Sequence, residues 1–479
     1  MDLTTSEGIC YTHLCSLTVV NEMAVNETIV LEWRGVDGMK FFGREKEIVE
    51  LRKLREFSCE NAQFTVLTGR RRVGKTALLR QAFDDSQTPY LNLPVTRQPE
   101  ITLCDQMQRE AESVLGLGIH GTCRRFGELF EELMRESLRR PFTLVLDEFQ
   151  EFDRTNPGIF GDVQHIWDKY QSRSKINLVV CGSVNRLMKK IFFNDSEPLY
   201  GRNTAKLELQ PFSVPLLKEI FGHFHPNYTP DDLLALWTVS GGVARYVDLV
   251  MSRRAFTRNE MLDLIFSPTS AYIDEGRTVL ADEFGPDYGT YFTIMAAIAT
   301  GKTTSAELKN LLGVEVGGYL SKLEKDYALV SKKQPLFERT VAKNCHYQID
   351  DCFFRFWFRF IFKSEYLLEL GRRDRMREIA ERDFEVFSGV ALERYFQWKF
   401  IGEGRYTRLG GWWDRKGENE IDLVGEDEAN DTLDFYEVKH DADRLDLDDL
   451  RMKSAAFFAK NPELKSRAIS FHGLSLQDM

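Results

Sequence analysis

Long apolar runs are lacking in this sequence of 479 residues. A helix that spans a bilayer needs about 20 predominantly apolar residues. The most apolar stretch, residues 353–361, is interrupted by Arg355 and Arg359. The amino-terminal residues also lack the continuous apolar segment that a secretion signal requires. We therefore expect a cytoplasmic protein that does not associate with membranes.

Paired cysteines are lacking as well. The eight cysteines are scattered along the chain, and no two of them form a C-x-x-C pair. Such thiols do not have the spacing of a zinc site, and they fit a reducing compartment better than a disulfide framework. They are Cys10, Cys15, Cys59, Cys104, Cys123, Cys181, Cys345 and Cys352.

An excess of positive charge is also absent, because 63 lysines and arginines stand against 74 acidic residues and the net charge is −11. No global basic field draws this chain to nucleic acid, so any such contact must come from a local patch. Hydrophobic residues make up 43% of the chain, which is typical of a globular protein. The length predicts about three domains.

The stretch at residues 64–80 is the most informative part of the sequence. A short apolar strand, Phe64–Leu67, leads into G-x-x-x-x-G-K-T, and an amphipathic helix follows. This order of strand, loop and helix is the context that a phosphate-binding P-loop requires, and a chance glycine-rich turn does not explain it. Lys75 would reach the β- and γ-phosphates of ATP, and Thr76 would bind Mg²⁺. The predicted cradle consists of Gly69, Arg70, Arg71, Arg72, Val73, Gly74, Lys75 and Thr76.

A second apolar strand, residues 141–146, ends in Asp147 and Glu148. Asp147 is expected to hold Mg²⁺ through water, and Glu148 to polarise the attacking water. The alternative is a strand end with solvated acids. A further strand at 176–181 is followed by Ser183, which we expect to contact the γ-phosphate or the lytic water. Asn185 is the second choice, and a plain turn role is the alternative. These strands alternate with helices, which predicts a parallel sheet with the ligand at the carboxyl ends of its strands.

Two arginines further along are candidates for contacts with phosphate. Arg202 fits either a charge-stabilising finger that acts on a neighbouring subunit of a homo-oligomer or a surface ion pair. Arg245 closes a helical region and could touch the phosphates from a lid, although a structural role is the alternative. Ahead of the P-loop, residues 42–54 predict an amphipathic helix. Residues 1–38 lack a clear period, and we expect a poorly ordered leader, with a strand at 28–33 as the alternative and Met39 as the natural start.

Residues 286–373 have the pattern of a winged helix. Helices are predicted at 291–298, 304–312 and 316–325, and a hairpin at 329–348. The third helix would be the recognition helix for DNA, but such a module can also serve as a lid or a dimer element. The basic and polar residues that it offers are Tyr319, Ser321, Lys322 and Lys325, and the hairpin adds Lys332 and Lys333.

The C-terminal sequence predicts a helix at 384–400 and then strands at 406–413, 420–424 and 433–439. Asp422 lies on the second strand, and Glu437 and Lys439 lie on the third, with one residue between them. Strand side chains alternate faces, so Glu437 and Lys439 point the same way, and Asp422 can join them. This is the PD-(D/E)xK nuclease pattern without its proline.

The two carboxylates would hold Mg²⁺ and Lys439 would orient or activate water for attack on a phosphodiester. Glu393, on the preceding helix, would complete the metal site. The alternatives are a charge-rich β-meander and a nuclease fold that has lost its activity.

Together these motifs resemble the prokaryotic, archaeal-type ATPases at the border of the AAA+ and STAND groups, in the variety with a C-terminal restriction-endonuclease-like domain. The resemblance covers nearly all of the chain from Met39 onward. It implies that the P-loop binds ATP and Mg²⁺, that Asp147 and Glu148 support hydrolysis, and that Glu393 belongs to the nuclease site. The segments that carry it are residues 42–45, 69–76, 144–150, 182–183, 201–202, 241–242, 347–358, 389–396 and 420–439. The chain departs from the family at Ala244, where proline is usual, and this weakens the transfer of a lid role to Arg245.

The expected fold is an α/β P-loop ATPase domain with a parallel sheet, followed by a helical lid and a winged helix, and then a small α/β nuclease-like domain. The first functional hypothesis is an ATP-operated switch that cleaves or binds nucleic acid, with DNA favoured over RNA. The second is a regulatory ATPase whose inactive C-terminal scaffold binds DNA or a protein partner. A small-molecule kinase is disfavoured by Glu148 and by the long C-terminal modules. The expected domains are a leader at 1–38, an ATPase core at 39–212, a lid at 213–285, a winged helix at 286–373 and a nuclease-like domain at 374–479.

Overall fold

The computed structural model describes residues 41–84, 88–183, 185–284, 288–338 and 345–479. Contacts divide the chain into residues 1–43 and 44–479, and the helices and strands that the structure describes lie in the second unit. The predicted leader, the alternative strand within it and Met39 lie outside the described residues. Within the described ranges, no helix combines the length and the apolar character that crossing a membrane would require.

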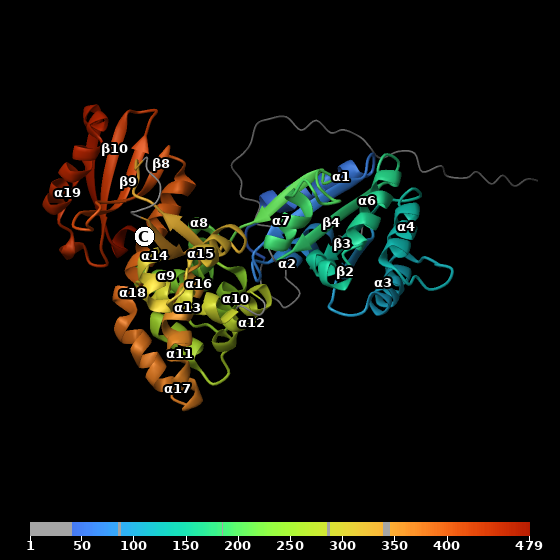
Figure 1. Ribbon diagram of the computed structural model, residues 1–479, viewed down its shortest axis with the longest axis horizontal. Coiled ribbons are helices and arrows are strands. Elements are labelled where there is room, and N and C mark those ends of the chain that lie inside the picture. The colour runs from blue at the N-terminus through green and yellow to red at the C-terminus, as the bar shows by residue number, and fades with distance from the viewer. Residues whose placement is uncertain (1–40, 85–87, 184, 285–287, 339–344) are drawn as a thin grey trace, which may run out of the picture. The chain divides into compact units, whose positions relative to one another are not determined.

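A five-stranded sheet forms the first part of this unit (Figure 1). Its strand order is β2-β3-β4-β1-β5, and every neighbouring pair is parallel, which confirms the expected α/β sheet. The interior strands are buried along almost their whole length because helices cover them, as their continuous apolar sequences predict. The strands are β1 (Gln63–Gly69), β2 (Tyr90–Pro94), β3 (Phe142–Asp147), β4 (Ile176–Gly182) and β5 (Ala205–Leu209).

Helices alternate with these strands. The helix predicted just before the P-loop is present and begins at Glu45, and it contacts β1 and β4. Phe64 and Trp167 meet in the core with their ring centroids 5.0 Å apart, so aromatic packing anchors the P-loop strand. The helices are α1 (Glu45–Ser58), α2 (Lys75–Phe83), α3 (Glu100–Leu115), α4 (Phe126–Glu136), α5 (Phe152–Thr155), α6 (Ile159–Tyr170) and α7 (Asn185–Phe193).

The next segment is helical. Thr229 and Thr257 begin two of its helices with capping boxes, in which each threonine accepts a hydrogen bond from the backbone three residues later. These caps explain where the helices start. The helices are α8 (Val214–Phe224), α9 (Pro230–Ser240), α10 (Ala244–Ser252), α11 (Arg258–Phe266) and α12 (Tyr272–Phe284).

Three helices and an antiparallel ribbon follow, in the order that the sequence predicts. The helices are α13 (Tyr288–Ala299), α14 (Ser305–Leu312) and α15 (Gly317–Lys325). The ribbon consists of β6 (Val330–Lys333) and β7 (His346–Ile349).

The ribbon packs against the C-terminal sheet, which the sequence did not indicate. The Leu336 amide donates to the Gly411 carbonyl at 2.9 Å, and Leu336 and Phe337 join the apolar core of that sheet. Burial lowers the pKa of the Lys333 amine. Because it is half-buried, Lys333 does not provide the freely exposed charge that we expected of a wing.

The apolar stretch near residue 355 forms α16 (Cys352–Phe356) and a π-helical turn, η3 (Trp357–Ile361). The Trp357 indole donates to the Ile273 carbonyl of α12 at 2.9 Å. The Trp237 indole of α9 donates to the Ala391 carbonyl at 3.1 Å. A short helix, α17 (Glu365–Glu369), leads to the long helix α18 (Arg373–Glu403), which contacts α9 and α11. The expected boundaries near residues 285 and 373 thus fall between elements that pack closely on one another.

The last segment is a four-stranded mixed sheet with the order β11-β10-β9-β8. Strands β8, β9 and β10 lie where the sequence predicts strands and pair antiparallel, and β11 adds a parallel edge. Helix α19 (Leu447–Lys460) packs on β9, β10 and β11. The strands are β8 (Arg408–Trp413), β9 (Glu420–Asp427), β10 (Thr432–Val438) and β11 (Ala468–Leu474).

The packing of α12 on η3 gives a prediction about stability. A Cβ atom at Gly276 would overlap the Trp357 indole, so Gly276→Ala should destabilise the protein by about 1–3 kcal/mol. Gly289, in α13, has open space around it, so Gly289→Ala should be stabilising by about 0.5–1 kcal/mol. Urea unfolding of both variants would test this, and equal midpoints would contradict the packing.

Candidate functional site

The loop between β1 and α2 has the geometry of a phosphate cradle. Gly69 has a φ of +149°, and a Cβ atom there would lie 2.7 Å from the Leu209 carbonyl oxygen. Gly74 has a φ of +100° and begins α2. Both positions require glycine, because side chains rarely adopt such angles. Val73 is buried beneath the loop, so of the eight predicted cradle residues it provides packing.

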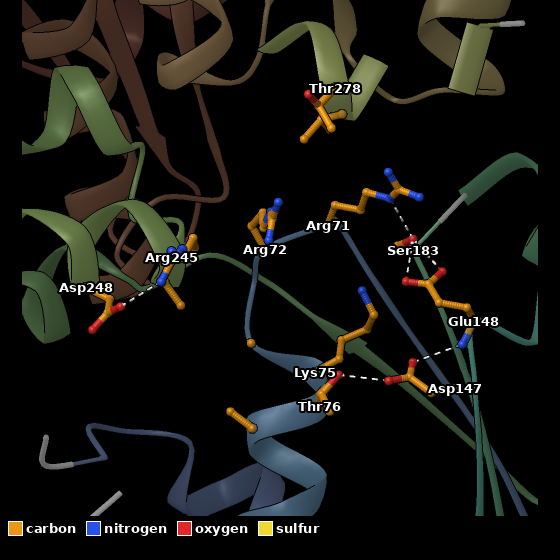
Figure 2. Close-up of a pocket in the computed structure, with 14 residues that line it drawn as sticks. Arg71, Arg72, Lys75, Thr76, Asp147, Glu148, Ser183, Arg245, Asp248 and Thr278 are labelled. Carbon is orange, nitrogen blue, oxygen red and sulfur yellow. Dashed lines mark hydrogen bonds and ion pairs between the residues drawn. The ribbon is translucent and has the colours of Figure 1, made fainter. Parts of the chain in front are cut away.

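A cavity of about 560 Å³ lies above this loop (Figure 2). Three predicted groups meet in it, namely the P-loop, the acids after β3, and Ser183 after β4. It also contains Arg245 of α10, which the sequence singled out as a possible phosphate contact, and further residues of α10 and α12 that it did not. The lining residues are Arg71, Arg72, Gly74, Lys75, Thr76, Ala77, Asp147, Glu148, Ser183, Ala244, Arg245, Asp248, Thr278 and Val279.

Lys75 places a buried ammonium group at the bottom of the cavity. Its Nζ donates to the carbonyl oxygens of Gly69 at 2.7 Å and Arg70 at 3.1 Å. Burial lowers the pKa of this amine, and the charges of Glu148 and Asp147 oppose the shift. Because burial disfavours the charged form, an anionic phosphate in the cavity would stabilise it. The cavity therefore fits the phosphates of a nucleotide.

Thr76 and Asp147 provide the oxygen atoms that would hold Mg²⁺. The Thr76 hydroxyl donates to Asp147 Oδ2 at 2.9 Å, so the two lie side by side. Asp147 Oδ1 accepts from the Glu148 amide at 2.9 Å and from the Cys181 thiol at 2.8 Å. Burial, and then the charge of Asp147, raise the pKa of Cys181 well above its usual range, so the thiol remains a donor. Hydroxyl and carboxylate oxygens are ligands that Mg²⁺ prefers.

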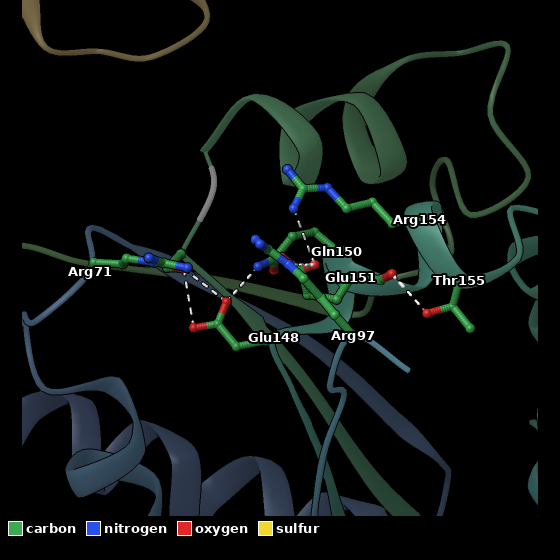
Figure 3. A network of polar contacts seen from close by, with 8 residues as sticks. Arg71, Arg97, Glu148, Gln150, Glu151, Arg154 and Thr155 are labelled. Carbon is green, nitrogen blue, oxygen red and sulfur yellow. Dashed lines mark hydrogen bonds and ion pairs between the residues drawn. The ribbon is translucent and has the colours of Figure 1, made fainter. Parts of the chain in front are cut away.

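Glu148 is held by neighbouring donors (Figure 3). Its backbone is left-handed, with a φ of +54°. The Ser183 hydroxyl donates to Glu148 Oε2 at 2.8 Å, and the Gln150 amide donates to the same oxygen. Arg71 in turn donates to the Ser183 hydroxyl at 3.3 Å. Gln150 was not predicted, although its place two residues after Glu148 at the same strand end was a usable signal.

The three P-loop arginines point in different directions. Arg70 forms an ion pair with Asp351 and does not line the cavity. Arg71 contacts Ser183, and Arg72 donates to Glu275 of α12 at 2.9 Å. Of these three arginines, only Arg71 and Arg72 therefore direct their side chains to the cavity.

The two downstream arginines also differ. Arg202 pairs with Asp168 at 3.1 Å and does not line the cavity, which is the surface ion pair that the sequence allowed. A role for Arg202 at the nucleotide of a neighbouring subunit stays a prediction. Arg245 lines the cavity and pairs with Asp248 at 3.3 Å, despite the departure at Ala244. Asn185 begins α7.

A second group of charged side chains lies at the ends of β9 and β10. Lys439 Nζ lies 3.3 Å from Glu437 Oε1 and 3.7 Å from Asp422 Oδ2. The Val438 amide donates to Asp422 Oδ2, and the Asp446 amide donates to Glu437 Oε2, each at 2.7 Å. These backbone donors fix the orientation of both carboxylates. The predicted convergence of the three side chains is therefore present.

Two acids of this group, Glu393 and Asp422, have raised pKa values, and burial is the main cause for both. Burial, and then the charges of Asp422 and Glu420, raise the pKa of Glu393 to about 8, while Arg355 and Lys439 oppose the shift. Burial lowers the pKa of Lys439, but the charges of Asp422 and Glu437 outweigh this and raise it. Across the residues that the structure describes, no three acidic, histidine or cysteine side chains are grouped closely enough to hold a metal ion. The expected three-carboxylate site is therefore not preformed.

Comparison with known proteins separates the two halves of the chain. Residues 41–250 match a family described as an ATPase domain predominantly from Archaea. Residues 357–452 match a family of archaeal and bacterial proteins of unknown function, which assigns no nuclease activity.

Individual relatives extend the likeness over most of the chain. The uncharacterized protein MJECL04 of Methanocaldococcus jannaschii is 27% identical over 410 residues, which cover 83% of this chain and 87% of the relative. The structure of the Walker-type ATPase PABY2304 of Pyrococcus abyssi is 18% identical and has a TM-score of 0.51, covering 66% of this chain and 96% of that one. At this identity the likeness supports the fold alone. The match over residues 41–250 supports an ATPase domain of the archaeal type.

Proposed function

We propose that this protein is an ATP-hydrolysing switch that acts on DNA through its C-terminal region. One observation carries the proposal: Lys75, Thr76, Asp147 and Glu148 converge on one cavity. They do so within a domain that matches the archaeal ATPases.

Hydrolysis transfers the γ-phosphoryl group of ATP to water, with ADP as the leaving group. Lys75 would bind the β- and γ-phosphates and offset their charge. Thr76 and Asp147 would hold Mg²⁺, which neutralises charge on the phosphates. Glu148 would orient the water and accept its proton. The donors that now hold its carboxylate must first release it, so the described arrangement is a resting state.

The first prediction separates binding from hydrolysis. Lys75→Ala should weaken binding of an ATP analogue about 10- to 100-fold, because one charge-assisted hydrogen bond is lost. Glu148→Gln should bind ATP normally but hydrolyse it about 10²- to 10⁴-fold more slowly. Fluorescent nucleotide titration and phosphate release would measure the two. Lys169→Ala, a surface change in the same domain that breaks the Lys169–Glu131 ion pair, is the control and should retain both properties. Normal turnover by Glu148→Gln would refute the assignment.

DNA cleavage is proposed for the group at the ends of β9 and β10. Asp422 and Glu437 would hold Mg²⁺, and Glu393 would join them once it loses its proton. Protonated Lys439 would orient the attacking water and offset charge on the phosphate. The support is the geometry of these side chains together with the helix and three antiparallel strands that carry them. The elements at 288–349 would bind the DNA as a winged helix, with α15 as the helix that reads it.

The second prediction concerns cleavage. Asp422→Ala and Lys439→Ala should each abolish nicking of DNA in Mg²⁺ or Mn²⁺ while ATP turnover stays within a few-fold of that of the unchanged protein. Glu428→Ala, an exposed acid near the far end of β9, is the matched control and should still cleave. Gel assays on single- and double-stranded DNA and RNA would show this. If both variants nick as fast as the unchanged protein, the site lies elsewhere.

A second candidate function is a regulatory ATPase with a C-terminal scaffold that binds DNA or a protein partner without cutting. The observation that favours it is the lack of a preformed three-acid group among the described residues. A failure of the unchanged protein to cut any nucleic acid, with or without ATP, would select this function.

The third prediction uses the protonation of Glu393. Its pKa in the folded protein is about 8, above the ordinary value of 4.5, so the native state holds the extra proton between these limits. The free energy of unfolding should therefore fall with rising pH across this window, by up to about 1.4 kcal/mol per pH unit. Glu393→Gln should flatten the dependence and be more stable than the unchanged protein at a pH above that pKa. Urea unfolding at several pH values would measure this. The same pH dependence of the free energy of unfolding in Glu393→Gln and in the unchanged protein would contradict it.

A further inference from the structure

Asp351 connects the P-loop to helix α16. Its Oδ1 accepts from the Phe354 amide at 2.8 Å, which caps the helix. Its Oδ2 forms an ion pair with the Arg70 guanidinium. That guanidinium also lies 4.6 Å from the centroid of the Phe354 ring. The Asp351 side chain is only 6% exposed. Because the pair is largely desolvated, neither partner can move far without the other.

The residues that flank Asp351 also form hydrogen bonds with α18. Arg355 donates to the Phe387 carbonyl at 3.0 Å and lies 4.1 Å from the centroid of the Phe387 ring. Arg394 of α18 donates to the Asp350 carbonyl at 3.2 Å and to the Ile349 carbonyl. The residues on both sides of Asp351 are thus held by α18, and Arg394 is the neighbour of Glu393.

A second set of contacts also connects the P-loop to the segment that contains Asp351. Arg72 of the P-loop donates to Glu275 of α12 at 2.9 Å. On the same helix, the Ile273 carbonyl accepts a hydrogen bond from the indole of Trp357, the residue that follows α16. Two arginines of one loop therefore reach the same segment, residues 351–357, by separate paths.

Nucleotide binding would alter the loop at Arg70. Lys75 donates to the Gly69 and Arg70 carbonyls in the described arrangement. A bound phosphate would attract the ammonium group, so these two carbonyls would lose a charged donor and the backbone beside Arg70 would readjust. The ion pair passes such a shift to Asp351, and rigid helices carry it onward.

We propose that Asp351 is a positioning residue through which nucleotide in the P-loop sets the placement of Glu393 against Asp422 and Glu437. This rests on the proposed function, since Glu393 has a task only if that group binds a metal ion. Coupling of two sites typically changes affinity about 5- to 150-fold, and the effect is reciprocal.

The test is amide hydrogen exchange of α18 in the full chain, with and without a non-hydrolysable ATP analogue and Mg²⁺. The unchanged protein should show altered exchange at residues 387–397 when the analogue binds. Asp351→Asn should lose this response while binding the analogue within a few-fold of normal. Asp350→Asn removes the same charge one residue earlier and is the matched control, so it should keep the response.

A second variant tests whether Asp351→Asn loses the response only because it misfolds. Arg70→Gln breaks the same ion pair from the P-loop side and should also lose the response. Retention of the response in both variants, or no response in the unchanged protein with the analogue bound, would overturn the proposal.

The two proposals fail separately. Failure to bind the analogue would refute the ATP site, and failure to cut nucleic acid would refute the nuclease task. In the second case the exchange experiment still reports whether α18 responds to nucleotide. If the protein cuts DNA, Asp351→Asn should reduce the dependence of cutting on ATP at least about 5-fold, the lower limit of typical coupling.

Discussion

The parallel alignment of β1, β3 and β4 is the constraint on which the nucleotide site depends. Parallel neighbours end at the same edge of the sheet, so the loop after β1, the acids after β3 and the serine after β4 are brought to one place. Residues far apart in the sequence, such as Arg71 and Ser183, can then share a hydrogen bond. The aromatic contact between Phe64 and Trp167 fixes the strand that carries the cradle.

The same cavity is closed on its other side by helical residues, including Arg245 and Thr278. A nucleotide in this cavity would therefore lie between the sheet and the helices. Arg70 and Arg72 extend this contact to α16 and α12, beyond the reach of the phosphates themselves. The variable positions of a P-loop thus connect the loop to the rest of this chain.

The parts that could be predicted from the sequence are those whose signal is local. The cradle, the paired acids and the alternating strands follow from spacing and apolar runs, because neighbouring residues determine them. Gln150 and Asp248 contact Glu148 and Arg245, which are two and three residues away, so their signal was local and was overlooked. The contact between Asp351 and Arg70 was missed, because these two residues are distant in the sequence. The position of the ribbon was missed for the same reason: Lys332 and Lys333 look like a free basic tip until the packing of the adjoining apolar residues is known.

That packing has a consequence for any attempt to divide the molecule. Leu336 and Phe337 lie against the C-terminal sheet, and Phe337 stacks edge to face on Phe457 with ring centroids 5.8 Å apart. A fragment that stops before β8 would leave these two side chains in water as an adhesive patch. Such a fragment would tend to self-associate. Any affinity that it showed for nucleic acid or for other proteins would reflect the newly exposed apolar side chains and not the intact chain.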